Sequence, residues 1–102
     1  MTDPTARKRE ILEAAIAACC GDRQLNYGTP EKNFERIAIL WNAWMDIRVS
    51  NPSITEGEFA PWEIAAMMIL MKLARLANTP GHKDSWIDIA GYAACGYDIT
   101  NA

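Results

Sequence analysis

One stretch of this sequence limits the possible folds more than any other. The segment IAAMMILMKLA at positions 64–74 has apolar residues all around the helical turn, and Lys72 is its only charged residue. A helix with no polar face must be buried between other helices or in a contact between subunits. Pro61 before the segment and NTPG at 78–81 after it predict a helix from Pro61 to about Ala77.

Three other segments also have helical periodicity. The first runs from about Pro4 to Cys20, and Gly21 is expected to end it as a C-terminal glycine. The second starts at Thr29-Pro30, with Thr29 as the N-cap, and ends before Ser50-Asn51-Pro52. The last runs from about Asp84, as its cap, to about Ile99.

The expected packing faces follow from the same periodicity. In the second helix the stripe consists of Phe34, Ile37, Ala38, Trp41, Trp44, Met45 and Arg48. In the last helix it consists of Trp86, Ala90, Ala93, Ala94 and Tyr97. No segment alternates as a strand does, so we predict a single all-α domain over residues 1–102, a four-helix bundle-like fold. A chain of 102 residues has little core of its own, which favours completion by homo-oligomerisation.

Composition excludes several functions. A net charge of −3 argues against nucleic-acid binding through bulk charge. No apolar run is long enough to span a membrane, and the charged N-terminal segment does not resemble a secretory signal. Cys19, Cys20 and Cys95 do not form a disulfide framework, so we expect small buried side chains in a reducing cytoplasm.

The last predicted helix carries a pair of carboxylates. Asp84 and Asp88 are four residues apart and share a face, which Tyr92 continues. Such a pair is a partial ligand shell for Mg²⁺, and Glu63 at the start of the preceding helix is a candidate third ligand. The structural alternative is a capping Asp84 with an exposed Asp88, and a Glu63 that only complements the helix dipole.

Basic residues lie near these acids in sequence. Lys72 and Arg75 are three residues apart in the apolar helix, and His82 precedes Asp84 by two residues. The two cations either pair with Asp84 and Asp88 or bind a phosphate, which Arg can hold through two hydrogen bonds.

The segment GDRQLNYG at 21–28 has the composition of a nucleotide-binding loop. Arg23 would neutralise phosphate and Tyr27 would stack on a base. The same composition occurs in plain loops, and the spacing of a P-loop or a dinucleotide fingerprint is absent.

Three blocks together suggest a family: GDRQLNYGTPEKNFERIAILWNAW, EIAAMMILMKLARL and HKDSWIDIAGYAA. They resemble a family of small bacteriophage and prophage proteins over about Ile11 to Cys95. That resemblance implies a location in the host cytoplasm.

A wider resemblance links the chain to the MazG-like all-α nucleoside triphosphate pyrophosphatases. It implies a helical dimer or tetramer that holds Mg²⁺ with acids from two adjacent helices and releases pyrophosphate. Glu63, Asp84 and Asp88 would be the catalytic and metal-binding residues. Lys72 and Arg75 would contact phosphates. Whether the protein hydrolyses or only binds its ligand, we expect the ligand-binding residues to be Arg23, Tyr27, Asn33, Lys72, Arg75, His82 and Tyr92. The sequence departs from that family, because the third helix has one carboxylate rather than two and the fourth has D-x-x-x-D.

Three functions follow from these observations. The first is a Mg²⁺-dependent nucleoside triphosphate pyrophosphohydrolase. The second is a non-catalytic protein that binds and sequesters a nucleotide or a nucleotide-derived signal of host defence. The third is a protein–protein adaptor that acts through the apolar helix between Ile64 and Leu76.

Overall fold

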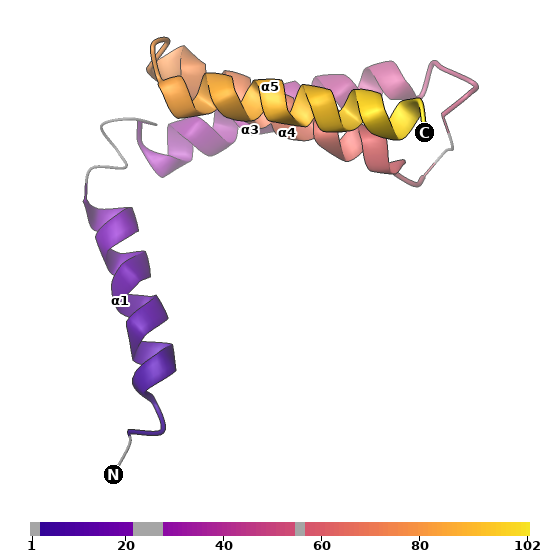
Figure 1. Ribbon diagram of the computed structural model, residues 1–102. Coiled ribbons are helices and arrows are strands. Elements are labelled where there is room, and N and C mark those ends of the chain that lie inside the picture. The colour runs from indigo at the N-terminus through magenta and orange to yellow at the C-terminus, as the bar shows by residue number, and fades with distance from the viewer. Residues whose placement is uncertain (1–2, 22–27, 55–56) are drawn as a thin grey trace.

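The computed structural model describes residues 3–21, 28–54 and 57–102. Over these ranges the chain is helical and contains no strand, which confirms the predicted all-α four-helix fold. The helices are α1 (Ala6–Cys20), α3 (Pro30–Arg48), α4 (Pro61–Asn78) and α5 (Lys83–Thr100) (Figure 1).

The apolar helix α4 is the centre of the fold. Both α3 and α5 pack against it, whereas α3 and α5 do not contact each other over their described residues. A short turn after Asn78 joins α4 to α5, so these two helices form an antiparallel hairpin (Figure 1). The all-round apolar pattern of α4 therefore reflects neighbours on two of its sides.

Helix α1 is separate from this three-helix layer. It contacts none of the other helices in the described part of the chain, and none of its residues is buried. It points away from the layer in Figure 1. The Cα radius of gyration is 17.5 Å, larger than the ~13 Å of a compact chain of about 100 residues.

Local signals account for most helix boundaries. Thr29 caps α3 by accepting a hydrogen bond from the Lys32 N–H at 3.3 Å, as predicted. Pro30 and Pro61 occupy the first turns of α3 and α4, where the missing N–H costs nothing. Two expectations were wrong. Gly21 ends α1 at φ −104° rather than in the left-handed region, and Asp84 lies inside the first turn of α5 instead of capping it.

The buried apolar core is small. Among the described residues it consists of Ile37, Met67, Ala74 and Leu76. The side chains of α3 that face α4 recur every three or four residues, and one of them, Trp41, donates its indole N–H to the Met67 carbonyl at 2.8 Å. The predicted packing stripe of α3 was too wide, because Phe34, one of its predicted members, is 65% exposed.

The predicted packing face of α5 was wrong. Trp86 and Tyr97 are 54% and 72% exposed, and the predicted alanines are exposed as well. The face toward α4 instead carries the buried Ser85 and the half-buried Asp88 and Tyr92. Large aromatic residues on α5 therefore lie on the outer surface, where the chain itself does not cover them.

The cysteines also differ from the expectation. Cys19, Cys20 and Cys95 are all exposed free thiols, not small core residues. Over the described residues, no helix combines the length and the apolar content needed to cross a bilayer.

Candidate functional site

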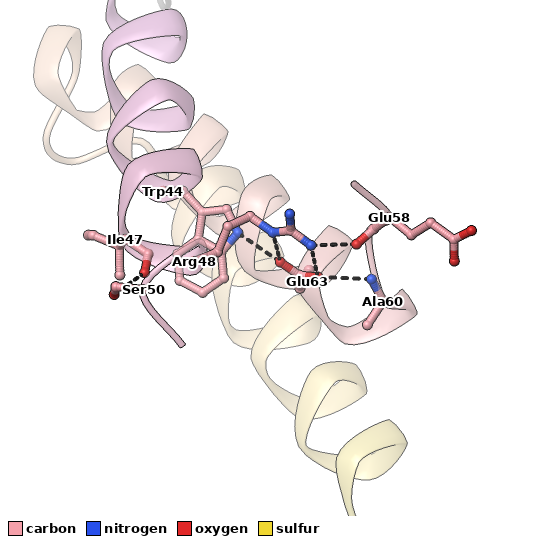
Figure 2. Close-up of polar contacts among 7 residues, drawn as sticks. All are labelled: Trp44, Ile47, Arg48, Ser50, Glu58, Ala60 and Glu63. Carbon is pink, nitrogen blue, oxygen red and sulfur yellow. Dashed lines mark hydrogen bonds and ion pairs between the residues drawn. The ribbon is translucent and has the colours of Figure 1, made fainter. Parts of the chain in front are cut away.

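A buried ion pair joins the end of α3 to the start of α4. The Arg48 Nε donates to Glu63 Oε2 at 2.5 Å, and an Nη of Arg48 donates to Glu63 Oε1 at 2.9 Å (Figure 2). The side chains are only 3% and 0% exposed. Arg48 also donates to the Glu58 carbonyl, and its guanidinium lies 4.7 Å from the centre of the Phe59 ring.

Both oxygens of Glu63 accept further hydrogen bonds from the protein. The Ala60 N–H donates to Oε1 at 2.9 Å, and the Trp44 indole N–H donates to Oε2 at 3.3 Å (Figure 2). The Arg48 hydrogen bonds, helped by those from Ala60 and Trp44, lower the pKa of Glu63 to about 2 against the opposing effect of burial. Glu63 in turn raises the pKa of Arg48.

A second polar cluster lies at the other end of the α4–α5 hairpin. We call the set Asn33, Lys72, Arg75, His82, Ser85 and Asp88 the hairpin-end cluster. Within it, the Lys72 Nζ lies 2.8 Å from Asp88 Oδ2 and joins α4 to α5. The Lys72 side chain is only 10% exposed, whereas that of Asp88 is 43% exposed. Of the predicted pairing of Lys72 and Arg75 with Asp84 and Asp88, the Lys72–Asp88 salt bridge is therefore present.

The turn between α4 and α5 orders the start of α5. His82 precedes the helix, and its Nδ1 lies 2.7 Å from the Ser85 hydroxyl, which is 1% exposed. The His82 N–H donates to the Thr79 carbonyl at 3.1 Å, and the Trp86 indole N–H donates to the Pro80 carbonyl at 2.8 Å. These contacts hold an imidazole and a hydroxyl at a helix N-terminus, where the backbone dipole favours anions.

Asn33 enters the hairpin-end cluster from α3. Helices α3 and α4 are antiparallel: Arg48 meets Glu63 at one end, and Gly28 approaches Asn78 at the other. Gly28 has a φ of +76°, and a Cβ there would lie 2.9 Å from the Asn78 Oδ1. This register places Asn33, in the first turns of α3, level with the last turns of α4 that carry Arg75.

In this cluster Asn33 carries a buried acceptor atom and Arg75 a buried donor atom. Asn33 is 6% exposed, and its Oδ1 has no hydrogen-bond partner within the described chain. The Nε of Arg75, a half-buried residue, is also buried. A buried amide oxygen without a donor costs about 1–3 kcal/mol, so its retention calls for an explanation.

The three candidate magnesium ligands do not converge. Glu63 is nine positions before Lys72, about 13 Å along the helix axis, and it is held by Arg48 at the opposite end of α4. Asp88 is paired with Lys72, and Asp84 is exposed. No group of three or more His, Cys, Asp or Glu side chains suited to a metal occurs among the described residues. The MazG-type acidic set therefore does not fit this geometry, and Mg²⁺ binding stays a prediction.

The remaining predicted ligand residues separate into two groups. Arg23 and Tyr27 lie outside the described residues. Tyr92 is half-buried one turn beyond Asp88 and lines a groove between α4 and α5. Of the predicted set, the hairpin-end cluster includes Lys72, Arg75 and His82 on the α4–α5 hairpin and Asn33 on α3, level with Arg75.

Sequence reasoning missed two residues of these polar clusters, Arg48 and Ser85. Arg48 was recognised only as part of a stripe, and Ser85 was not singled out. A signal for Arg48 was present, because a cation on an otherwise apolar stripe requires a buried carboxylate partner. Ser85 offered no comparable signal, since serine at a helix start is common.

These observations define the class of the molecule: a small all-helical protein with a structural ion pair at one end and a polar, partly cationic cluster at the other. The chain belongs to the family described as Domain of unknown function (DUF6378), which it matches over residues 10–100. Together with the two phage relatives described next, this match confirms the predicted phage protein family in its coarser form.

Two curated relatives support this assignment. The Gene 55 protein of Mycobacterium phage D29 is 41% identical over 85 residues, which cover 83% of this chain and 50% of that protein. The Gene 55 protein of Mycobacterium phage L5 is 41% identical over 83 residues, 81% of this chain and 47% of that protein. The chain therefore spans about half the length of the curated relatives it matches. No solved structure gives a significant match.

Proposed function

We propose that this protein binds a nucleotide or a nucleotide-derived small molecule at the hairpin-end cluster without hydrolysing it. The observation that carries the proposal is the buried Asn33 Oδ1, which lacks a hydrogen-bond donor in the described chain. This acceptor lies level with Arg75 of α4 in the antiparallel register of α3 and α4.

A nucleotide carries both the donors that Asn33 lacks and the acceptors that the cationic part of the cluster can bind. Its amino, imino and ribose hydroxyl groups are donors that suit the Asn33 oxygen. Its phosphate oxygens are acceptors that suit the guanidinium of Arg75 and the N-terminal turn of α5, where His82 and Ser85 lie. A bare phosphate would supply only the acceptors and would leave the Asn33 oxygen without a donor.

The acidic residues support binding rather than hydrolysis. Glu63 is held by four protein hydrogen bonds, two from Arg48 and one each from Ala60 and Trp44. Asp88 neutralises Lys72 instead of facing a second carboxylate across the helices. Asp84 is exposed and is the carboxylate of the acidic set with most freedom to meet a ligand-bound cation.

The test is calorimetric titration and thermal shift with a panel of ribonucleotides and deoxyribonucleotides, as mono-, di- and triphosphates, and with cyclic dinucleotides. Each ligand is tested with and without Mg²⁺, and products are separated by chromatography. We expect binding of at least one ligand without product. Release of pyrophosphate would replace this proposal by the pyrophosphohydrolase, and no binding across the panel would refute it.

Matched variants locate the site. Asn33→Leu should abolish binding while leaving the free protein as stable as the wild type or more so, because it removes a buried amide with an unmet acceptor. Arg75→Ala should weaken binding at least about tenfold, the loss of one charge-assisted contact. Asn42→Leu on the exposed side of α3 and Arg7→Ala on α1 are controls that should bind normally.

A further inference from the structure

Helix α1 presents an apolar stripe that its own chain does not cover. Ile11, Leu12 and Ile16 are 68%, 63% and 62% exposed and lie on one side of the helix. In the described chain α1 contacts no other helix. A helix of 15 residues is marginal in water without tertiary packing, so a stable α1 requires a surface that covers this stripe.

A groove that can accept the apolar stripe of a helix lies between α4 and α5. Its volume is about 230 Å³, and its lining includes four small residues, Ala65 and Ala66 from α4 and Ala93 and Gly96 from α5, beside larger ones such as Trp62, Ile69 and Tyr92. Gly96 lets the two helices approach closely, since a Cβ there would lie 3.3 Å from that of Ala65. Apolar side chains of a third helix can enter the groove where these four small residues leave room.

The surfaces around the groove continue its apolar character. Trp62 and Tyr97 lie at its edges, and Tyr97 is 72% exposed. An exposed apolar area of this kind marks an interaction surface.

Charge sets the direction of docking. Arg7, Lys8 and Arg9 occupy the first turn of α1. The last turn of α5 has no basic residue, contains Asp98, and ends in carbonyl groups that favour cations. An α1 helix antiparallel to α5 would therefore place its basic start at the end of α5 and its apolar stripe along the groove.

We infer that the α4–α5 groove binds α1 of a second copy of this chain, in a reciprocal dimer. In this structure α1 points away from its own three-helix layer (Figure 1), as an exchanged helix does. A two-fold exchange covers both α1 stripes and both grooves and leaves neither unpaired. The dimer does not depend on the proposed ligand, so each can fail without the other.

Light scattering over a range of protein concentrations tests the dimer. The wild type should have twice the 11.4 kDa mass of the chain. Ile16→Glu and Ala93→Arg should weaken the dimer at least about 100-fold. Ala14→Glu, on the opposite side of α1, and Ala94→Arg, which does not line the groove, are matched controls that should remain dimers.

Crosslinking then identifies the occupant. Leu12→Cys and Ala93→Cys are combined in a chain whose three native cysteines are serine, and the protein is oxidised. A covalent dimer on a non-reducing gel supports the exchange. A crosslink confined to monomers shows that α1 folds back on its own groove and overturns the proposal, as does a wild type that is monomeric throughout or an Ile16→Glu variant that stays dimeric.

Discussion

Arg48 and Glu63 form a two-point ion pair that fastens the last turn of α3 to the first turn of α4. Both side chains are almost fully buried, so the pair is shielded from water and salt. Glu63 also accepts the Ala60 N–H, one of the donors that a helix start leaves without an intrahelical partner. A single carboxylate thus caps α4 and anchors α3.

Removing the charge of Glu63 should therefore be costly. Glu63→Gln leaves the Arg48 guanidinium buried without its carboxylate, and we expect a loss of about 3 kcal/mol in the free energy of unfolding. Urea denaturation followed by circular dichroism measures it. Glu58→Gln is the control, because that side chain is exposed, and its effect should stay within about 0.5 kcal/mol. Equal effects of the two variants would contradict a structural role for the pair.

Removing both charges should cost much less than removing one. In Arg48→Met with Glu63→Met, no unpaired charge remains buried, and apolar replacements of a buried ion pair are often neutral or stabilising. We expect the double variant to recover more than half of the loss seen with Glu63→Gln. A double variant whose loss equals the sum of the single losses would show that the two residues act independently.

The lowered pKa of Glu63 predicts how stability depends on pH. The folded pKa is about 2 and the ordinary value is 4.5, so the unfolded chain binds the proton more tightly. The contribution of this group is complete above about pH 4.5 and is lost as the pH falls from there toward 2. Thermal unfolding between pH 7 and pH 2 should show this loss, and the Glu63→Gln variant should show a shallower slope. Parallel slopes would rule out Glu63 as the cause.

The ion pair at the hairpin end should be weaker but measurable. Asp88→Asn removes the partner of the nearly buried Lys72, and because Asp88 is 43% exposed, water partly compensates. We expect a loss of about 1 kcal/mol, against less than about 0.5 kcal/mol for Asp84→Asn, since Asp84 is exposed on the same helix. Indistinguishable unfolding midpoints for the two variants would refute the contribution of the pair.

The helix bounds were predictable because their signals are local. Thr29-Pro30, Pro61 and the NTPG turn each act on their own backbone, so no knowledge of distant residues is needed. The facing of α5 was not predictable in this way. The periodicity of α5 identifies an apolar side but does not tell whether that side packs on α4 or stays exposed to solvent. Trp86 and Tyr97, on the predicted packing side, are exposed.

The candidate site was predictable in part for the same reason. Lys72 and Asp88 were recognised as potential partners because each stands out on its own helix, and the structure pairs them. The pairing of Arg48 with Glu63 depends on how α3 returns along α4 after a connecting segment. Sequence spacing carries no information on that register, so Glu63 was expected to bind metal when it instead holds a guanidinium.

The two glycines of α5 offer a final test of the α4–α5 contact. Gly91→Ala adds a methyl group that meets nothing within 4 Å, so the higher helix propensity of alanine should stabilise the protein by about 0.5–1 kcal/mol. Gly96→Ala has the same intrinsic gain, but its Cβ would lie 3.3 Å from the Cβ of Ala65, and the helices must shift to admit it. We therefore expect Gly96→Ala to be less stable than Gly91→Ala in urea denaturation. An equal gain in both variants would show that α5 does not pack this closely on α4.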